Sequence, residues 1–157
     1  MPARGGQKLR MYSSIVVGTD GSETATEAVR QAAGLARAFG AMLDIVSAYE
    51  PASVDRLRVE QSGAVPDPRW AVNARGEIDQ TLDAAATLAR GLGVTVNVFA
   101  RQGDPADSIL DVAEERGADL IVIGNKGLTG AQRFLLGSVP NKISHHAPCS
   151  VLIIRTG

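Results

Sequence analysis

Four glycines lie in one stretch of the chain, GNKGLTGAQRFLLGS at residues 124–138, which follows directly on the apolar run DLIVI. Glycine in a regular element costs about 0.5–1 kcal/mol relative to alanine, so such a cluster has a cause. One cause is turn geometry, when a strand-to-helix connection needs a positive φ or a close approach of the backbone. The other is a ligand whose phosphates contact main-chain N–H groups that a Cβ atom would keep at a distance.

The spacing of this stretch narrows the chemistry. Gly124 is followed after two residues by Gly127, after nine more by Gly137, and then by Ser138. The pattern is neither the Walker A loop G-x-x-x-x-G-K-[ST] nor the dinucleotide fingerprint G-x-G-x-x-G. It places Gly137 and Ser138 where a short helix is expected to begin, and the free N–H groups and dipole of a helix start attract anions. The stretch therefore predicts an anion site.

A second polar stretch, GTDGS at residues 18–22, contributes a carboxylate, Asp20. A carboxylate beside a triphosphate repels it unless the carboxylate accepts hydrogen bonds from ribose hydroxyls or holds Mg²⁺, so we expect one of these roles for Asp20. The alternative is local, since Asp20 also suits an Asx-turn or a helix N-cap. Ser22 is expected to be a helix N-cap rather than a nucleophile, because no histidine lies near it in the motif.

Four further charged or titratable residues were considered as ligand groups. Lys126 and Arg133 lie inside the glycine-rich stretch and are expected to meet the β or γ phosphate, with a solvated surface charge as the alternative for Arg133. His145 and His146 are adjacent, so on a helix they diverge by about 100° and do not chelate one metal ion together. We interpret them as last-turn cations favoured by the helix dipole.

Five strands with helices between them must position these groups. Runs rich in β-branched residues occur at residues 13–18, 41–48, 94–100, 119–124 and 150–155. Apolar residues recur at helical spacing over residues 22–39, about 69–92 and 104–117, and a shorter helix is expected after Ser138, with Pro140 near its first position. Strands that alternate with helices imply crossover connections, hence a parallel sheet with helices on both faces.

The composition of the strands predicts their order. VTVNV alternates apolar and polar residues, as at a half-exposed edge, whereas LIVI and IVV are apolar throughout and indicate central strands. We therefore expect a five-stranded, doubly wound α/β sheet of order 3-2-1-4-5, which opens a crevice where the chain leaves strands 1 and 4 in opposite directions. The loops at 18–22 and 124–138 face this crevice. Because turn geometry alone would not concentrate glycine in these two loops, we favour the ligand explanation.

The composition excludes several other classes of protein. The chain has 157 residues, 45% of them apolar, and a net charge of −1, so it lacks the basic excess of a DNA- or RNA-binding domain. The single Cys149 is interpreted as a small buried hydrophobe in a reducing compartment. Residues 1–11 are expected to be a disordered leader before one domain at 12–157. No apolar run approaches the 18 or so residues of a membrane span, so we expect a cytoplasmic protein without a membrane partner.

Together these motifs resemble the universal stress proteins, in the nucleotide-binding branch with the signature G-2x-G-9x-G-[S/T]. The resemblance covers nearly the whole chain after the leader. It is carried by IVVGTDGSE, ADLIVIGNKG, LLGSVPNKI and the ending PCSVLII. It implies a flavodoxin-like fold of the adenine nucleotide α-hydrolase type that binds ATP, or in some members cyclic AMP, and that forms a homodimer.

The resemblance also implies a role for each matched residue. Main-chain groups of four residues would hold the phosphates, namely Gly124, Gly127, Gly137 and Ser138, and the Ser138 hydroxyl would be a further donor. Asp20 would lie beside the sugar and phosphates, with Mg²⁺ as a further partner, and Ala48 would pack on adenine. The other residues expected to line the site are Gly18, Thr19, Ile123, Asn125, Lys126 and Val139.

Two segments outside the site carry further expectations. Strand 150–155 is expected at the sheet edge, is apolar on both faces and has no charge before Arg155. An unprotected apolar edge predicts antiparallel pairing with a second copy across a twofold axis. Residues 49–68 form a long connection with three prolines, and such a connection is either a lid over adenine or a disordered segment.

Several functions fit these features, and the first is a stress regulator that binds ATP, with cyclic AMP as the alternative ligand. The second is a slow ATPase, although only Asp20 and Lys126 offer groups for phosphoryl transfer, so we expect at most weak hydrolysis. A phosphoacceptor receiver domain is disfavoured, because Arg101 and Arg155 stand where it needs aspartate and lysine. A nucleotide-free interaction module would carry no bound adenine.

Overall fold

Five parallel strands form one sheet in the order β3-β2-β1-β4-β5, as the strand composition predicted. The structure is a computed structural model, and it describes residues 11–49, 69–125 and 137–156. The strands are β1 (Ser14–Gly18), β2 (Met42–Tyr49), β3 (Val96–Gln102), β4 (Leu120–Gly124) and β5 (Ser150–Ile154). The expected leader up to residue 10 and the connection at 50–68 lie outside the described residues.

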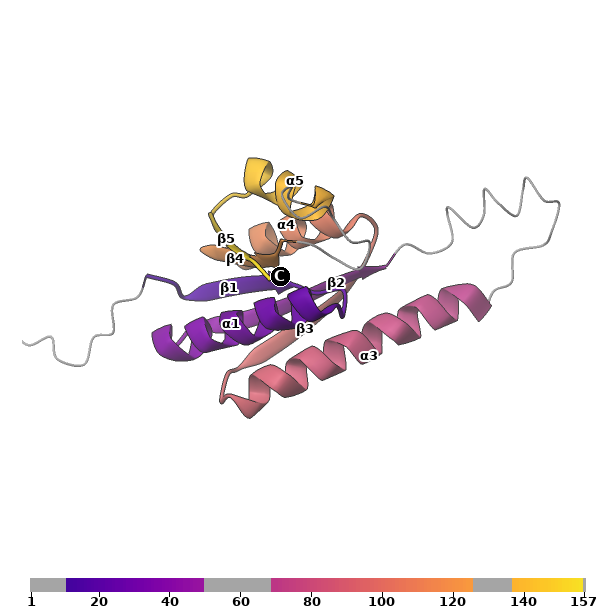
Figure 1. The fold of residues 1–157 in the computed structure, drawn as a ribbon, viewed down its shortest axis with the longest axis horizontal. Helices are drawn as coiled ribbons and strands as arrows, with labels where there is room; N and C mark the ends of the chain where they lie inside the picture. The colour runs from indigo at the N-terminus through magenta and orange to yellow at the C-terminus, as the bar shows by residue number, and fades with distance from the viewer. Residues whose placement is uncertain (1–10, 50–68, 126–136, 157) are drawn as a thin grey trace, which may run out of the picture.

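Within the described ranges, four helices cover the two faces of the sheet. They are α1 (Glu23–Phe39), α3 (Arg69–Gly91), α4 (Pro105–Arg116) and α5 (Ser138–His146). Figure 1 shows α1 and α3 on one side of the sheet and α4 and α5 on the other. We call these two sides the α1/α3 face and the α4/α5 face. The doubly wound arrangement expected from the alternation of strands and helices is therefore confirmed.

The helix ends follow the capping residues in the sequence. Ser22 Oγ accepts a hydrogen bond of 3.2 Å from the Ala25 N–H at the start of α1, and Asp104 Oδ2 accepts one of 3.0 Å from Asp107 N–H at the start of α4. Helix α5 starts at Ser138, so Pro140 is its third residue rather than near its first. Proline is still tolerated there, because no N–H in the first turn has an intrahelical partner.

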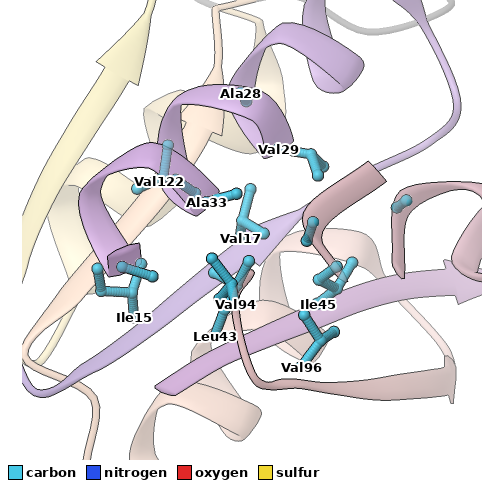
Figure 2. Close-up of a cluster of buried hydrophobic side chains, with 14 of the residues drawn as sticks. Ile15, Val17, Ala28, Val29, Ala33, Leu43, Ile45, Val94, Val96 and Val122 are labelled. Carbon is cyan, nitrogen blue, oxygen red and sulfur yellow. The ribbon is translucent and has the colours of Figure 1, made fainter. Parts of the chain in front are cut away.

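Branched apolar residues on the strands and small residues on α1 form the core of the α1/α3 face. Ile15, Val17, Leu43, Ile45 and Val122 are fully buried there. In Figure 2, Ile15, Val17, Leu43 and Ile45 lie below Ala28 and Ala33, and Val122 lies beside Ala33. The single methyl groups of the two alanines let α1 lie close to the sheet. The α4/α5 face has a core of its own, built on Val16, Val46 and Ile121. Strands β1 and β4 are thus buried on both faces, which confirms them as central.

The two outer strands each expose a large apolar side chain. Val98 on β3 is 41% exposed, and Leu152 on β5 is 37% exposed. These are the strands that the sequence placed at the edges. Cys149, just before β5, is half-buried rather than buried, and burial raises the pKa of its thiol. A thiol that resists ionisation is a packing group rather than a nucleophile. In the part of the chain that is described, no helix is long and apolar enough to cross a bilayer.

A carboxylate joins the starts of β1 and β4, at the edge of the sheet opposite the glycine-rich loops. Asp119 accepts hydrogen bonds from Ser13 N–H at 2.9 Å, from Ser14 N–H at 3.1 Å and from Ser13 Oγ at 3.0 Å. Partial burial pushes the pKa of Asp119 upward, but the hydrogen bonds from Ser13 and Ser14 outweigh it and leave the pKa below its ordinary value of 3.8. The ionised side chain therefore stabilises the folded state.

We predict that Asp119→Ala lowers the free energy of unfolding by about 1–3 kcal/mol at pH 7, from the loss of charge-assisted hydrogen bonds. A carboxylate with a lowered pKa stabilises the fold above its unfolded-state pKa, and this contribution disappears as the pH falls through its folded-state pKa. The difference between wild type and Asp119→Ala should therefore shrink below about pH 4 in urea titrations. Asp111→Ala, at an exposed position of α4, is the control and should change stability by less than about 0.5 kcal/mol. A difference that stays constant from pH 7 to pH 3 would contradict the assignment.

Candidate functional site

The carboxyl ends of three parallel strands bring most of the predicted site residues to one edge of the sheet. Gly18 at the end of β1 is paired with Val46 of β2, and Thr19 N–H donates to Val46 O at 2.9 Å. Ala48 lies near the end of β2 and is half-buried. At the end of β4, Ile123 and Gly124 pair with Ile153 and Ile154 of β5, and Asn125 follows.

Local hydrogen bonds shape the loop after β1. Thr19 is 9% exposed, its Oγ1 accepts from Gly21 N–H at 3.1 Å, and its main-chain oxygen accepts from Ser47 Oγ at 2.7 Å. Asp20 is exposed, and its Oδ1 accepts from Ser22 N–H at 2.9 Å. This bond is the Asx-turn named above as the alternative role of Asp20. The turn holds the carboxylate beside the carboxyl end of β1, at the edge of the sheet where the neighbouring strand β4 also ends.

Close packing accounts for two of the glycines at this edge. A Cβ atom on Gly124 would lie 2.6 Å from Thr24 Cγ2, and one on Gly18 would lie 2.3 Å from Ile109 Cδ1. Gly21 adopts a φ of +81°, which side chains disfavour. Packing and turn geometry therefore suffice at Gly18, Gly21 and Gly124. The expectation that turn geometry alone would not place glycines here is therefore wrong at these three positions, and the glycine pattern by itself does not indicate a ligand at them.

The start of α5 lies beside the end of β4. Gly137 N–H donates to Asn125 O at 3.1 Å, so the two ends of the glycine-rich stretch meet. Gly137 is the N-cap of α5, with φ −62° and ψ 166°, and it offers no side chain to cap the helix. The first bond back along the helix runs from Asn141 N–H to Gly137 O at 3.1 Å.

Two N–H groups of this helix start have no partner among residues 11–49, 69–125 and 137–156. They belong to Ser138, which is exposed, and Val139, which is half-buried, while Pro140 has no N–H. By contrast, the side chains of Ser22 and Asp104 cap α1 and α4. N–H groups at a helix start carry partial positive charge, so this arrangement suits an anion.

Charged side chains tie α5 to α4. Lys142 Nζ lies 2.8 Å from Asp107 Oδ1 and 3.4 Å from Asp104 Oδ2. The hydrogen bond to Asp107, the largest cause, and the one to Asp104 raise the pKa of Lys142. Within the described ranges, no group of three or more His, Cys, Asp or Glu side chains could hold a metal ion. His145 and His146 are exposed in the last turn of α5.

Sequence reasoning missed a small polar network that supports this edge. The hydroxyls of Thr24 in α1 and Thr156 after β5 hydrogen-bond each other, and Thr156 N–H donates to Asn125 Oδ1 at 3.3 Å. No local pattern distinguishes these threonines, because their partners are distant in the sequence. The predicted site residues Lys126 and Gly127, and also Arg133, lie outside the described residues.

Comparison with known proteins gives consistent matches over nearly the whole chain. The sequence pattern of the universal stress protein family matches residues 11–155. Universal stress protein Rv1636 of Mycobacterium tuberculosis is 39% identical over 150 residues, which are 94% of this chain and 99% of the relative. Universal stress protein MJ0531 of Methanocaldococcus jannaschii is 32% identical over 155 residues, covering 97% of this chain and 86% of the relative.

Two solved structures with bound nucleotides share the fold. A universal stress protein in complex with cAMP superposes with a TM-score of 0.69 at 32% identity, over 93% of this chain and 98% of that one. The universal stress protein from Archaeoglobus fulgidus in complex with dAMP superposes with a TM-score of 0.67 at 27% identity, over 92% of this chain and 98% of that one. Both ligands contain adenine and one phosphate.

We predict that Gly124→Ala lowers the free energy of unfolding by about 1–3 kcal/mol in urea denaturation, because the new methyl group collides with Thr24 Cγ2. Thr24→Ser removes that Cγ2 atom and keeps the hydroxyl, so the double variant should recover part of the loss. Gly34→Ala in α1, where a Cβ meets nothing within 4 Å, is the control and should stabilise the protein by about 0.5–1 kcal/mol. Wild-type stability in Gly124→Ala would show that packing does not require this glycine.

Proposed function

Because this chain belongs to the universal stress protein family, we propose that it is a regulatory protein of the stress response that binds ATP at the carboxyl edge between β1 and β4. The observation that carries the proposal is the start of α5. It lies beside the end of β4, and its Ser138 and Val139 N–H groups have no partner in the described part of the chain.

The chemistry of this helix start suits a phosphate group. A hydrogen bond from an N–H group to a charged acceptor contributes about 1.5–3 kcal/mol net. The N–H groups of Ser138 and Val139, the Ser138 hydroxyl and the helix dipole together favour an anion. Gly124 and Gly127 stay in the proposal as neighbouring main-chain partners of the phosphates, with Lys126 as a cationic one.

The remaining edge residues suit the nucleoside. Ala48, half-buried at the end of β2, offers a small apolar surface for adenine, and Gly18, Thr19 and Ile123 extend the floor of the site. Asp20 is held by its Asx-turn at the mouth, where its carboxylate can accept hydrogen bonds from ribose hydroxyls. The proposal thus assigns the base to β2, the sugar to the β1 loop and the phosphates to α5.

Magnesium fits the proposed site only with help from the nucleotide. The described residues hold no cluster of three or more metal-binding side chains, so Asp20 is the one carboxylate proposed to hold the ion. Mg²⁺ commonly keeps several waters and binds through one or two carboxylates together with substrate phosphates. Bound there, the ion would neutralise phosphate charge beside Asp20.

Cyclic AMP is the second candidate ligand. The solved relative in complex with cAMP, at 32% identity, supports it. The start of α5 also supports it, because two N–H groups suit a single phosphodiester as well as one phosphate of ATP. Parallel titrations of the protein with ATP and cyclic AMP decide between the two.

The exposed edge of β5 supports a homodimer. Leu152 is 37% exposed on a strand whose other side chains are mostly apolar, and β5 pairs only with β4 within the described chain. A strand edge of this kind pairs readily with another chain. We assign the partner as a second copy, joined through antiparallel β5 strands across a twofold axis.

We predict that Ser138→Pro weakens ATP binding by about tenfold or more, measured by calorimetric titration, because it removes one N–H group and the hydroxyl from the helix start. Proline is favoured at this first helical position, and the extended ψ of 166° at Gly137 suits the residue before a proline. The helix content in circular dichroism should therefore stay unchanged.

Ser138→Ala is the matched control, because it loses the hydroxyl but keeps the N–H group. It should weaken ATP binding less than Ser138→Pro, and neither variant should change adenosine binding. If the two variants bound ATP with equal affinity, the Ser138 N–H group would not contribute to binding, contrary to the proposal. The nucleotide proposal as a whole fails if the purified wild type releases no adenine nucleotide in mass spectrometry and gives no heat with ATP or cyclic AMP.

We predict that the protein is dimeric at micromolar concentration in light scattering and that Leu152→Glu shifts it toward monomer. In the dimer, the two introduced carboxylates would face each other near the paired β5 strands, and the loss of their hydration would be unfavourable. Val98→Glu is the matched control, because Val98 is similarly exposed at the opposite edge of the sheet, and it should leave the dimer intact. A monomeric wild type would contradict the dimer proposal.

A further inference from the structure

The hydrogen bonds between β4 and β5 change at Asn125. In a parallel ladder, one residue donates its N–H to the neighbouring strand and accepts, at its own carbonyl oxygen, an N–H from two residues further along that strand. Asn125 N–H donates to Ile154 O at 2.9 Å, so the next bond of the ladder would run from Thr156 N–H to the main-chain oxygen of Asn125.

The side chain of Asn125 takes the place of that main-chain oxygen. Thr156 N–H donates to Asn125 Oδ1 at 3.3 Å, while the main-chain oxygen of Asn125 accepts from Gly137 N–H at 3.1 Å. The side-chain amide thus completes the β4–β5 ladder and leaves the main-chain carbonyl to hold the start of α5. With an apolar side chain at this position, the N–H groups of Thr156 and Gly137 would compete for the main-chain oxygen of residue 125. One of the two would then lose its hydrogen bond to this residue.

The surrounding contacts hold Asn125 and its partner Thr156 in place. The Thr156 hydroxyl is hydrogen-bonded to that of Thr24, which is 4% exposed in the first turn of α1. The main chain of Gly124, directly before Asn125, packs on the same Thr24 side chain. Three elements, α1, β4 and the segment after β5, therefore meet at one polar junction, and Asn125 connects this junction to α5.

We propose that Asn125 is a positioning residue for the phosphate group, and that its side chain acts by accepting the Thr156 N–H, which would otherwise compete with Gly137 for the main-chain oxygen. Asn125 places Gly137, and with it the Ser138 and Val139 N–H groups, through its main-chain oxygen, and its side chain makes this arrangement possible by replacing that oxygen in the ladder. The inference deepens the proposed function and rests on it for the identity of the ligand. The replacement of the main-chain oxygen by the Asn125 side chain in the ladder does not itself depend on a nucleotide.

The first test follows amide hydrogen exchange by NMR in the full ligand-free chain. Asn125→Leu keeps the size of the side chain but removes its acceptor, and it should raise the exchange rate of the Gly137 amide by about tenfold or more. Asn125→Asp keeps an oxygen at the Oδ1 position and should preserve the protection of Gly137. The amide of Val122, inside β4, reports on global stability and should change little in either variant. Unchanged protection of Gly137 in Asn125→Leu, or equal loss in both variants, overturns the proposal.

A second pair of variants tests Thr156 as the partner. Thr156→Pro removes the N–H donor, whereas Thr156→Ala keeps it and loses only the hydroxyl bond to Thr24. Thr156→Pro alone should leave the Gly137 amide protected, because no second N–H then competes for the main-chain oxygen of Asn125. For the same reason, adding Thr156→Pro to Asn125→Leu should restore most of the protection that Asn125→Leu loses, whereas adding Thr156→Ala should not. A double variant Asn125→Leu/Thr156→Pro whose Gly137 amide exchanges as fast as in Asn125→Leu contradicts the pairing.

The third test measures binding and separates the two proposals. With ATP, Asn125→Leu should lose about tenfold or more in affinity by calorimetry, while its adenosine affinity stays within about twofold of the wild type. A purely structural defect would weaken both ligands together, and that result overturns the positioning role. If the wild type binds no adenine nucleotide, the proposed function fails, and the exchange measurements still decide whether Asn125 places α5.

Discussion

Burial of both faces of the central strands is the constraint on which the arrangement of this edge depends. Val16 of β1 packs toward α4 and α5, whereas Ile15 and Val17 pack toward α1 and α3, and all three are fully buried. A strand covered on both faces lies in the middle of a sheet, and the chain must leave it on one face or the other. Because β1 is followed by α1 and β4 by α5, on opposite faces of the sheet (Figure 1), the chain leaves these two neighbouring strands toward opposite faces, and ligands of open α/β sheets bind at such switch points.

Main-chain polar groups decide which ligand this edge of the sheet suits. The loop after β1 satisfies its own N–H groups, since Thr19 and Asp20 accept from Gly21 and Ser22. The start of α5 is different, because the cap residue Gly137 has no side chain and its N–H donates a hydrogen bond to the main-chain oxygen of Asn125. The positive end of the helix dipole thus has no capping carboxylate or hydroxyl among the described residues. An anion would supply the missing acceptors, which is the physical basis for proposing a phosphate here.

The same edge shows how a sheet ladder can be extended by a side chain. At Asn125 the β4–β5 ladder continues through Oδ1, and the peptide carbonyl turns to α5. The end of the exposed strand β5 and the start of α5 are therefore fixed by one residue, with Thr24 and Thr156 closing the junction from α1 and the segment after β5. At the opposite edge, the Asp119 carboxylate holds the start of β1 against the start of β4.

The sequence by itself determined the strand order, the central and edge strands, the caps at Ser22 and Asp104 and the family, because these depend on local hydrophobic patterning, on capping chemistry and on motifs contiguous in the chain. Only the tertiary structure decided why Gly18 and Gly124 lack side chains, since the atoms that a Cβ would meet belong to Ile109 and Thr24, remote in sequence. The partnership of Asn125 with Gly137 and Thr156 was also hidden, whereas the Asx-turn of Asp20 was one of the roles that the sequence left open. Hydrogen bonds between distant segments leave no periodic trace in a sequence, because any residue supplies the main-chain donor and only the fold determines which acceptor it meets.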